Sequence, residues 1–367
     1  MKHIQILIKP ASSLCNLRCS YCFYADISSM RQVRSFGCMK PEVTEKLIEN
    51  VFADLEDADR LTICFQGGEP TLVGLKYFKN FTRLVKAQYK KVVVSYVIQT
   101  NGINIDEEWC NFLQQENFLV GLSIDGGLVF HDHYRPDASR RGTYQRVLAT
   151  KKLLDLYKIE HNILCVLTQE MAESASLVWE FIIQEAIQFI QFIPCLAELE
   201  EKENEFSVTS RGFATFYGEI FTLWQKEMQR GHYVSVKLFD DIANLLVNGV
   251  VGSCGMLGRC QMQYVIEANG NVYPCDFYVL DDMCVGNINH QTLRELFESP
   301  LTQHFICDKR EYRTCESCEF YKMCRGGCKR MKDACYVVAE DDDYCGYREV
   351  LKKVLPPLLG KVVSLIH

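Results

Sequence analysis

The sequence predicts an α/β fold, a partial (β/α)6 barrel of the TIM type followed by a smaller cysteine-rich domain. Up to about residue 235, apolar runs typical of buried strands alternate with amphipathic segments typical of helices. From Cys254 onward this periodicity weakens, and the segment that ends at Cys345 holds eleven of the nineteen cysteines. We therefore expect a barrel domain over residues 1–235 and a cysteine-rich domain over residues 236–367.

The predicted strands are apolar runs without strict alternation, as expected of parallel strands that are buried on both faces. They cover residues 4–8, 61–65, 92–98, 118–124, 162–167 and 189–193. Strands that alternate with helices in this way indicate an incomplete parallel barrel. In such barrels the chemistry lies at the carboxyl ends of the strands.

Several helices have recognisable boundaries in the sequence. One is expected to begin at Pro41, and another is expected to be capped by Asp106. Further helices are predicted over residues 143–157, 174–185, 207–230 and 238–247. A final helix over about residues 347–353 is expected to end before Pro356-Pro357. Asn269-Gly270 predicts a β-hairpin with a two-residue turn.

The composition is that of an ordinary globular protein, with 48% hydrophobic and 24% charged residues. The net charge of -7, without a block of Lys or Arg, argues against nucleic acid as a partner. No apolar run reaches membrane-spanning length, and the N-terminus lacks a signal-peptide pattern. We therefore expect a cytoplasmic protein with neither a nucleic-acid nor a membrane partner.

The cysteine content is exceptional, since nineteen cysteines occur in a chain that is expected to stay in the cytoplasm. A disulfide framework is a poor explanation, because the cytosol keeps thiols reduced. Metal binding explains the cysteines better.

The first cysteine cluster, Cys15-x3-Cys19-x2-Cys22, directly follows the first predicted strand. Three thiolates on one loop can hold three corners of an iron–sulfur cubane, which leaves one iron open to a small molecule. The alternatives are a zinc site that lacks a fourth ligand, or buried thiols. Cys38 is a further possible ligand.

The stretch from Cys15 to Cys22 resembles the cluster loop of radical SAM enzymes, and residues 66–70, Q-G-G-E-P, resemble their GGEP motif. This resemblance implies a 4Fe-4S cluster that binds S-adenosyl-L-methionine (SAM). The SAM contacts that it implies are Tyr21, Gln66, Gly67, Gly68, Glu69, Ser123, Arg135 and Leu196. The family often has Asp-Gly-Pro where this chain has Asp125-Gly126-Gly127, so a looser loop is expected there.

Eight C-terminal cysteines form a second array, whose spacing resembles the SPASM domain with its two auxiliary 4Fe-4S clusters. The resemblance assigns one auxiliary cluster to Cys254, Cys260, Cys275 and Cys328. It assigns the other to Cys315, Cys318, Cys324 and Cys345. A pair of structural zinc sites is the alternative, because Cys-x2-Cys followed by later cysteines also suits zinc.

The resemblance extends over nearly the whole chain and is greatest to the anaerobic sulfatase-maturating enzymes. Shared stretches include residues 8–13, 65–71, 99–102, 162–166 and, most tellingly, 272–280, V-Y-P-C-D-F-Y-V-L. It implies oxidation of a Cys or Ser of a client sulfatase to Cα-formylglycine through a 5′-deoxyadenosyl radical. Asp276 would be the catalytic base, and the second electron would leave through the cluster held by Cys275.

The partners implied are a peptide segment of the client sulfatase and an electron donor such as flavodoxin or ferredoxin. Tyr24 is a candidate substrate contact. The alternatives are a SPASM enzyme that forms a thioether, a carbon–carbon bond or an epimer in a ribosomal peptide, and a zinc-bound interaction module.

Overall fold

The computed structural model describes residues 1–199, 201, 203–256, 258–308, 312–337 and 344–366. The chain forms two compact units. Unit 1 consists of Met1–Ser123, Asp132–Asn162 and Met262–Cys307. Unit 2 consists of Ile124–His131, Ile163–Gln261 and Asp308–His367. The domain boundary near residue 235 stays a prediction.

Unit 1 is built on parallel strands. They are β1 (His3–Ile8), β2 (Arg60–Phe65), β3 (Val93–Thr100) and β4 (Phe118–Ser123), which pair in that order. On its other edge β1 pairs in parallel with β8 (Val265–Ile266), which continues antiparallel to β9 (Asn271–Tyr273) and β10 (Gly286–Asn287). The cysteine-rich segment therefore begins by adding strands to the barrel sheet beside β1.

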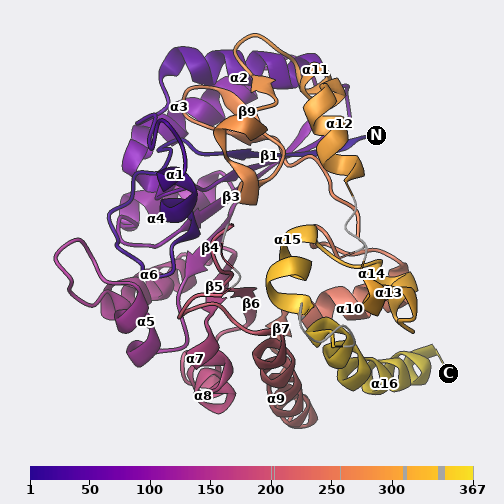
Figure 1. The fold of residues 1–367 in the computed structure, drawn as a ribbon. Coiled ribbons are helices and arrows are strands. Elements are labelled where there is room, and N and C mark those ends of the chain that lie inside the picture. The colour runs from indigo at the N-terminus through magenta and orange to yellow at the C-terminus, as the bar shows by residue number, and fades with distance from the viewer. Residues whose placement is uncertain (200, 202, 257, 309–311, 338–343, 367) are drawn as a thin grey trace. The chain divides into compact units, whose positions relative to one another are not determined.

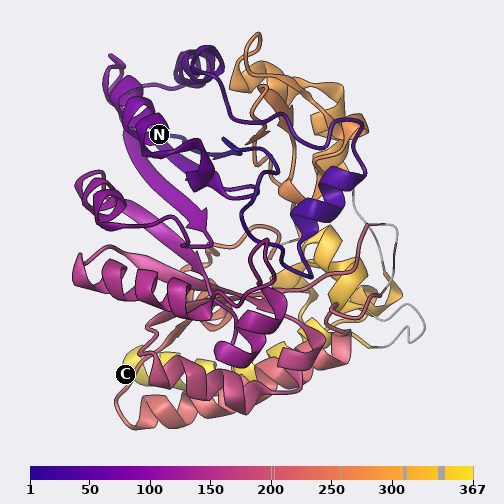
Figure 2. The ribbon, with the colours of Figure 1, turned by 90° about the vertical axis from the view of Figure 1, so that its left-hand side faces the viewer.

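Helices lie along one side of these strands (Figures 1 and 2), including α2, α3, α4 and α6. The helices that lie in unit 1 are α1 (Phe23–Ser29), α2 (Pro41–Ala53), α3 (Leu75–Lys86), α4 (Glu107–Gln115), α6 (Tyr144–Leu156), α11 (Leu293–Glu298) and α12 (Pro300–Cys307). Aromatic rings fill the layer between strands and helices. The ring of Phe65 meets those of Phe78 and Phe81 edge-on, with centroids 4.9 and 5.0 Å away.

Unit 2 contains β6 (Phe189–Pro194) between β7 (Ser235–Val236) and most of β5 (His161–Leu167), all parallel. Its helices include α7 (Gln169–Ala172), α8 (Ala175–Gln184), α9 (Ser210–Gln229), α10 (Lys237–Asn248), α13 (Arg313–Glu316), α14 (Tyr321–Cys324), α15 (Lys329–Met331) and α16 (Gly346–Ile366). The remaining helix, α5 (Leu128–Tyr134), crosses the division between the units.

The predicted strands are confirmed, each within two residues of its expected bounds. The helices predicted before α16 are confirmed as well, although α9 begins three residues later than expected because Thr209 caps it. Asp106 caps α4 by accepting a hydrogen bond from the Trp109 N–H at 2.9 Å. The strands are continuous apolar runs and most of the helices are amphipathic, and such patterns are the strongest signals in a sequence.

The predicted end of the last helix is wrong. α16 continues through Pro356 and Pro357 to Ile366. The two prolines remove backbone donors, which normally ends a helix. Here α16 packs against α9 and buries Leu351 and Val354, so tertiary packing offsets the missing hydrogen bonds.

The predicted hairpin is present, but its two-residue turn is wrong. The Gly270 N–H donates to the Glu267 carbonyl at 2.8 Å, so residues 268 and 269 occupy the centre of the turn. Gly270 follows in the left-handed region with φ +88°. This is the longer hairpin loop, in which a left-handed glycine follows the turn.

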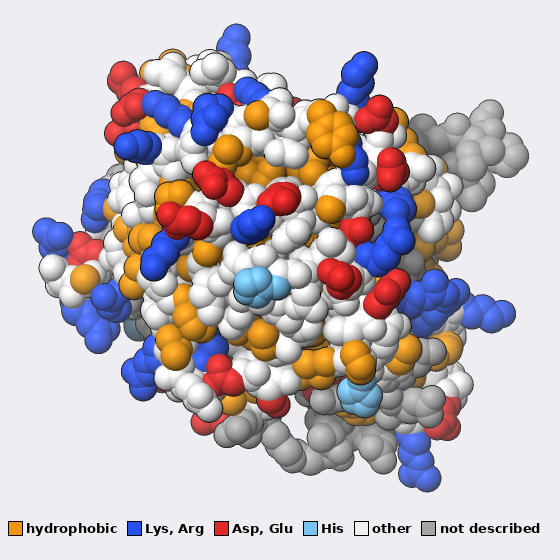
Figure 3. Space-filling model, turned by 90° about the horizontal axis from the view of Figure 1, so that it is seen from above, with side chains coloured by type: hydrophobic (Ala, Val, Ile, Leu, Met, Phe, Trp, Pro, Cys, Tyr) orange, Lys and Arg blue, Asp and Glu red, His pale blue; other side chains and the backbone are white. Residues whose placement is uncertain are grey.

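None of the described helices is both long enough and apolar enough to cross a bilayer. Figure 3 shows one face of the molecule, on which acidic and basic side chains are interspersed. Among the described residues of this face there is no continuous basic surface of the kind that attracts phosphates.

Substitution of Phe65 tests the packing of unit 1. Its side chain is fully buried among rings, so we expect Phe65→Ala to lower the free energy of unfolding by roughly 3–5 kcal/mol. The measurement is urea unfolding followed by circular dichroism. Tyr89→Ala is the control, because Tyr89 is 86% exposed. Equal stability of the two variants would contradict the packing described here.

Candidate functional site

The three cysteines of the first cluster lie half-buried on the loop between β1 and α1. Burial raises the pKa of Cys15 and Cys22, and backbone N–H groups oppose this shift. The Leu17 N–H donates to the Cys15 sulfur at 3.4 Å, and the backbone N–H groups of Ala25 and Tyr24 lower the pKa of Cys22. Thiols with such donors suit thiolate ligands of an iron–sulfur cluster, so the residues fit this group.

The turn after β2 packs directly against this loop. The Gly68 N–H donates to the Ser12 carbonyl at 2.9 Å, and the Glu69 N–H donates to the Leu14 carbonyl at 2.7 Å. A Cβ atom on Gly68 would lie 2.1 Å from the Leu14 oxygen. Only glycine permits this approach, and it places the predicted SAM-binding turn beside Cys15.

The Glu69 carboxylate is fully buried, and the protein itself satisfies it. It accepts hydrogen bonds from the hydroxyls of Thr71 and Thr100 at 2.6 and 2.7 Å, and from the Asn101 N–H at 2.8 Å. Burial raises the pKa of Glu69, and these hydrogen bonds counteract the shift. The side chain therefore joins the turns that follow β2 and β3.

Asp276 lies among three polar side chains from separate parts of unit 1. Its Oδ2 accepts hydrogen bonds from the Tyr24 hydroxyl and from Gln66 Nε2, each at 2.7 Å. Its Oδ1 is 2.9 Å from the ammonium of Lys9. The Lys9 and Asp276 side chains are only 4% and 13% exposed, so this is a buried ion pair rather than a surface contact.

Tyr24 connects the cysteine loop to Asp276, because it is two residues beyond Cys22. Burial raises the pKa of Tyr24 well above its ordinary value, and the charge of Asp276 raises it further. Tyr24 therefore remains a neutral phenol that donates to the carboxylate. A residue 252 positions away in the chain is thus placed beside the cysteine loop.

The remaining predicted SAM contacts lie in several parts of the chain. Tyr21 and Arg135 are brought together, since Arg135 donates to the Tyr21 hydroxyl at 3.0 Å. Ser123 is the last residue of β4. Leu196 follows β6 in unit 2. The roles predicted for these residues stay predictions.

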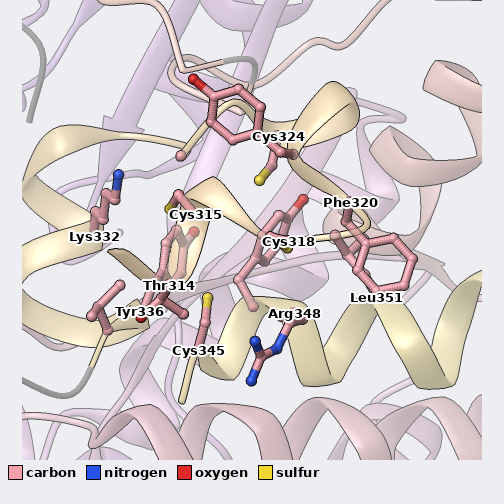
Figure 4. Close-up of a pocket in the computed structure, with 14 residues that line it drawn as sticks. Thr314, Cys315, Cys318, Phe320, Cys324, Lys332, Tyr336, Cys345, Arg348 and Leu351 are labelled. Carbon is pink, nitrogen blue, oxygen red and sulfur yellow. The ribbon is translucent and has the colours of Figure 1, made fainter. Parts of the chain in front are cut away.

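In unit 2 the sulfur atoms of Cys315, Cys318, Cys324 and Cys345 point into one cavity (Figure 4). The cavity contains about 400 Å³ of space. Burial raises the pKa of Cys324 to about 11, and the other three thiols contribute to this rise. Four thiols around one cavity fit a 4Fe-4S cluster.

Within the described part of the chain, no group of three His, Cys, Asp or Glu side chains is close enough to hold a single metal ion. A 4Fe-4S cluster spreads its cysteine sulfurs more widely, because each binds a different iron.

The four cysteines predicted to hold the other auxiliary cluster are divided between the units. In unit 2, a Cβ atom on Gly255 would lie 2.7 Å from the Cys328 Cβ, so the segment after Cys254 contacts Cys328. Cys260 is also near, since Cys328 raises its pKa after the larger effect of burial. Cys275 lies in unit 1 and directly precedes Asp276.

No role was predicted for Lys9 or Asn101, although both lie in stretches shared with the family. Lys9 directly follows β1 and is buried against Asp276. Asn101 directly follows β3 and contacts the cysteine loop. The available signal was a polar residue at the carboxyl end of a parallel strand, where catalytic residues concentrate.

Two family profiles match the chain. Residues 10–177 match the radical SAM superfamily, and residues 254–319 match SPASM, an iron–sulfur cluster-binding domain. The chain is 41% identical to the cysteine-type anaerobic sulfatase-maturating enzyme of Clostridium novyi, over 91% of this chain and 90% of that enzyme. The chain belongs to the anaerobic sulfatase-maturating enzymes. The resemblance predicted from the motifs is thereby confirmed.

Further members of this family are also similar. The cysteine-type enzyme of Clostridium perfringens is 39% identical, over 98% of both chains. The serine-type enzyme of Klebsiella aerogenes is 28% identical, over 96% of this chain and 85% of that enzyme.

The solved structure of native anSMEcpe with bound AdoMet and Kp18Cys peptide superposes with a TM-score of 0.90 at 36% identity, over 99% of both chains. This match confirms the predicted fold, a partial barrel with a SPASM domain. Streptococcus suis SuiB bound to its precursor peptide SuiA is 19% identical with a TM-score of 0.63, over 89% of this chain and 72% of that chain. That likeness concerns the fold alone.

The cysteine-lined cavity of unit 2 makes a prediction about iron content. Cys324→Ala removes one of four ligands, so we expect loss of one cluster of three, roughly a third of the iron and sulfide. Iron and sulfide per chain after anaerobic reconstitution measure it. Cys284→Ala is the control, because its thiol is outside both predicted ligand sets and donates to the Gly286 carbonyl. Full iron content in Cys324→Ala would contradict a cluster in this cavity.

Proposed function

We propose that this chain is a radical SAM oxidoreductase that converts a Cys or Ser of a client sulfatase into Cα-formylglycine. Membership of the anaerobic sulfatase-maturating enzymes supports this function. The structural observation that carries it is the hydrogen bond of 2.7 Å from Tyr24 to Asp276, because it sets a carboxylate beside the three-cysteine loop.

Three 4Fe-4S clusters belong to this proposal. Cys15, Cys19 and Cys22 would hold the cluster that binds SAM, and the eight C-terminal cysteines would hold the two auxiliary clusters in the sets given above. When loaded, the first site supplies one-electron cleavage of SAM and the radical that removes a hydrogen atom from the substrate Cβ. The turn from Gln66 to Glu69 would bind SAM with its backbone, while the Glu69 side chain fixes the shape of the turn.

Asp276 takes the thiol or hydroxyl proton of the substrate. Tyr24 and Gln66 both donate to Oδ2. Oδ1 has no hydrogen-bond donor in bonding geometry among the described residues, although Lys9 is 2.9 Å away. A carboxylate oxygen carries two acceptor positions, so Oδ1 is the oxygen that can receive the proton.

The atoms balance with this assignment. A cysteine side chain loses one hydrogen atom from Cβ to the radical, one proton from sulfur to Asp276, and one further electron, which would pass to the auxiliary cluster that Cys275 helps to hold. The resulting thioaldehyde reacts with water to give the aldehyde and hydrogen sulfide. For serine, loss of a hydrogen atom from Cβ, the hydroxyl proton and one electron gives the aldehyde directly.

The partners of this reaction follow from its chemistry. One is a peptide segment of the client sulfatase, and the other is a one-electron donor such as flavodoxin or ferredoxin. We place the reaction in the cytoplasm, where thiols stay reduced.

A peptide assay tests the function directly. We expect a short Cys-x-Pro-x-Arg peptide, incubated anaerobically with enzyme, SAM and reductant, to gain an aldehyde that mass spectrometry detects after hydrazine labelling. We also expect faster reaction than with the Ser-x-Pro-x-Arg peptide, since the cysteine-type relatives are more similar. Cleaved SAM beside unaltered peptide would favour another peptide modification.

Asp276→Asn separates proton removal from SAM cleavage. The amide keeps the size of the side chain but cannot accept the proton as a carboxylate does. We expect 5′-deoxyadenosine to form while the aldehyde yield falls at least 100-fold. Cys15→Ala is the contrasting variant and should stop both products while iron remains in the auxiliary sites. Normal aldehyde yield from Asp276→Asn would remove Asp276 from the mechanism.

A further inference from the structure

We propose that Asn101 raises the reduction potential of the cluster at Cys15, Cys19 and Cys22 by donating an N–H to the Cys15 sulfur. This inference rests on the proposed function, because it presupposes a cluster at those cysteines. It assigns Asn101 a positioning role, since the residue acts through a cluster ligand.

The amide nitrogen of Asn101 faces the cysteine loop. Nδ2 is 3.8 Å from the Cys15 sulfur and 2.7 Å from the Asn16 side-chain oxygen. An amide nitrogen carries two hydrogens, so it can serve both acceptors. Sulfur is a larger atom than oxygen, which accounts for part of the difference between the two distances.

The orientation of this amide is fixed by its other end. The Asn101 oxygen accepts a hydrogen bond from the Ile103 N–H at 3.0 Å. A backbone N–H can only donate, so the side-chain oxygen must face Ile103. The nitrogen is therefore directed toward Cys15 and Asn16, and the reversed orientation is excluded.

The residue is also held in place. Asn101 is only 5% exposed, and its backbone N–H donates to the Glu69 carboxylate at 2.8 Å. Glu69 in turn accepts hydrogen bonds from Thr71 and Thr100. A donor fixed in this way keeps its position when the charge on the cluster changes.

Hydrogen bonds to cluster sulfurs are among the factors that set reduction potential. A reduced cluster carries one more negative charge, so a donor stabilises the reduced form and raises the potential. Leu17 supplies a backbone donor to the same sulfur. Asn101 is a side-chain donor, so a substitution can remove it without altering the backbone.

The test is an anaerobic redox titration of the holoenzyme, followed by electron paramagnetic resonance. Addition of SAM identifies the relevant signal, because only a cluster with an open iron responds to it. For Asn101→Leu we expect the equilibrium constant for reduction to fall up to about tenfold. A tenfold fall lowers the reduction potential by about 59 mV for a one-electron step. Iron content should remain that of the unaltered enzyme.

Asn104→Leu is the matched control. Asn104 belongs to the same polar network, since it accepts from Asn16 at 3.4 Å and donates to Thr71 at 3.1 Å. Its substitution leaves the hydrogen bond to Cys15 intact, so the potential should not change. A similar shift in Asn104→Leu would show that the loop has moved and would overturn the assignment.

Asn101→Asp supplies a second variant of almost identical shape, in which oxygen replaces the donating nitrogen. An unchanged potential in both Asn101 variants, with full iron content, overturns the proposal. If neither variant holds the cluster, the test uses the unaltered enzyme labelled with 15N-asparagine. We expect a 15N coupling to the reduced cluster. Absence of this coupling overturns the proposal. If the unaltered enzyme gives no SAM-responsive signal, the proposed function itself fails.

Discussion

The candidate site depends on one buried ion pair, between Lys9 and Asp276. Neither charge could be buried alone without a large desolvation penalty, and removing one partner of such a pair typically costs roughly 3–5 kcal/mol. Gln66 and Tyr24 complete the surroundings of the carboxylate. The donors follow β1, lie in α1 and follow β2, so the position of Asp276 depends on the strand ends being in register. Ile8 opposite Phe65 gives that register.

A second buried charge organises the neighbouring strand ends. Glu69 follows β2 and is bound by Thr100 and Asn101 at the end of β3. Its four hydrogen bonds replace the water that an exposed carboxylate would have. The two networks share one principle, because each satisfies a buried charge with donors from adjacent strand ends. The polar side chains at the carboxyl ends of these strands are therefore held by buried hydrogen bonds.

Much of this fold could be predicted from the sequence, since its strands are continuous apolar runs and most of its helices are amphipathic. The wrong end of the last helix has a long-range cause. Pro356 should end a helix, but packing of α16 on α9 carries the helix past it.

In the candidate site, too, local motifs could be predicted from the sequence, whereas contacts between distant residues could not. Roles for the cysteines could be predicted from their spacing and its resemblance to the family, and the role of Asp276 from a family motif, and these roles stay predictions. The pairing of Asp276 with Lys9 could not be predicted, because a lysine after a strand is usually solvated and nothing local indicates a partner so distant in the sequence.

The addition of β8 to β1 explains how that distant pairing is achieved. The Lys9 N–H donates to the Ile266 carbonyl at 2.8 Å, so the backbone at the end of β1 is tied to the hairpin that leads to Asp276. The Lys9 side chain then reaches the carboxylate itself. Because the cysteine loop begins only six residues later, at Cys15, the hairpin cannot shift without disturbing that loop. The proposed reaction removes a hydrogen atom and a proton from one substrate side chain, which demands fixed relative positions, and this shared backbone anchor would supply them.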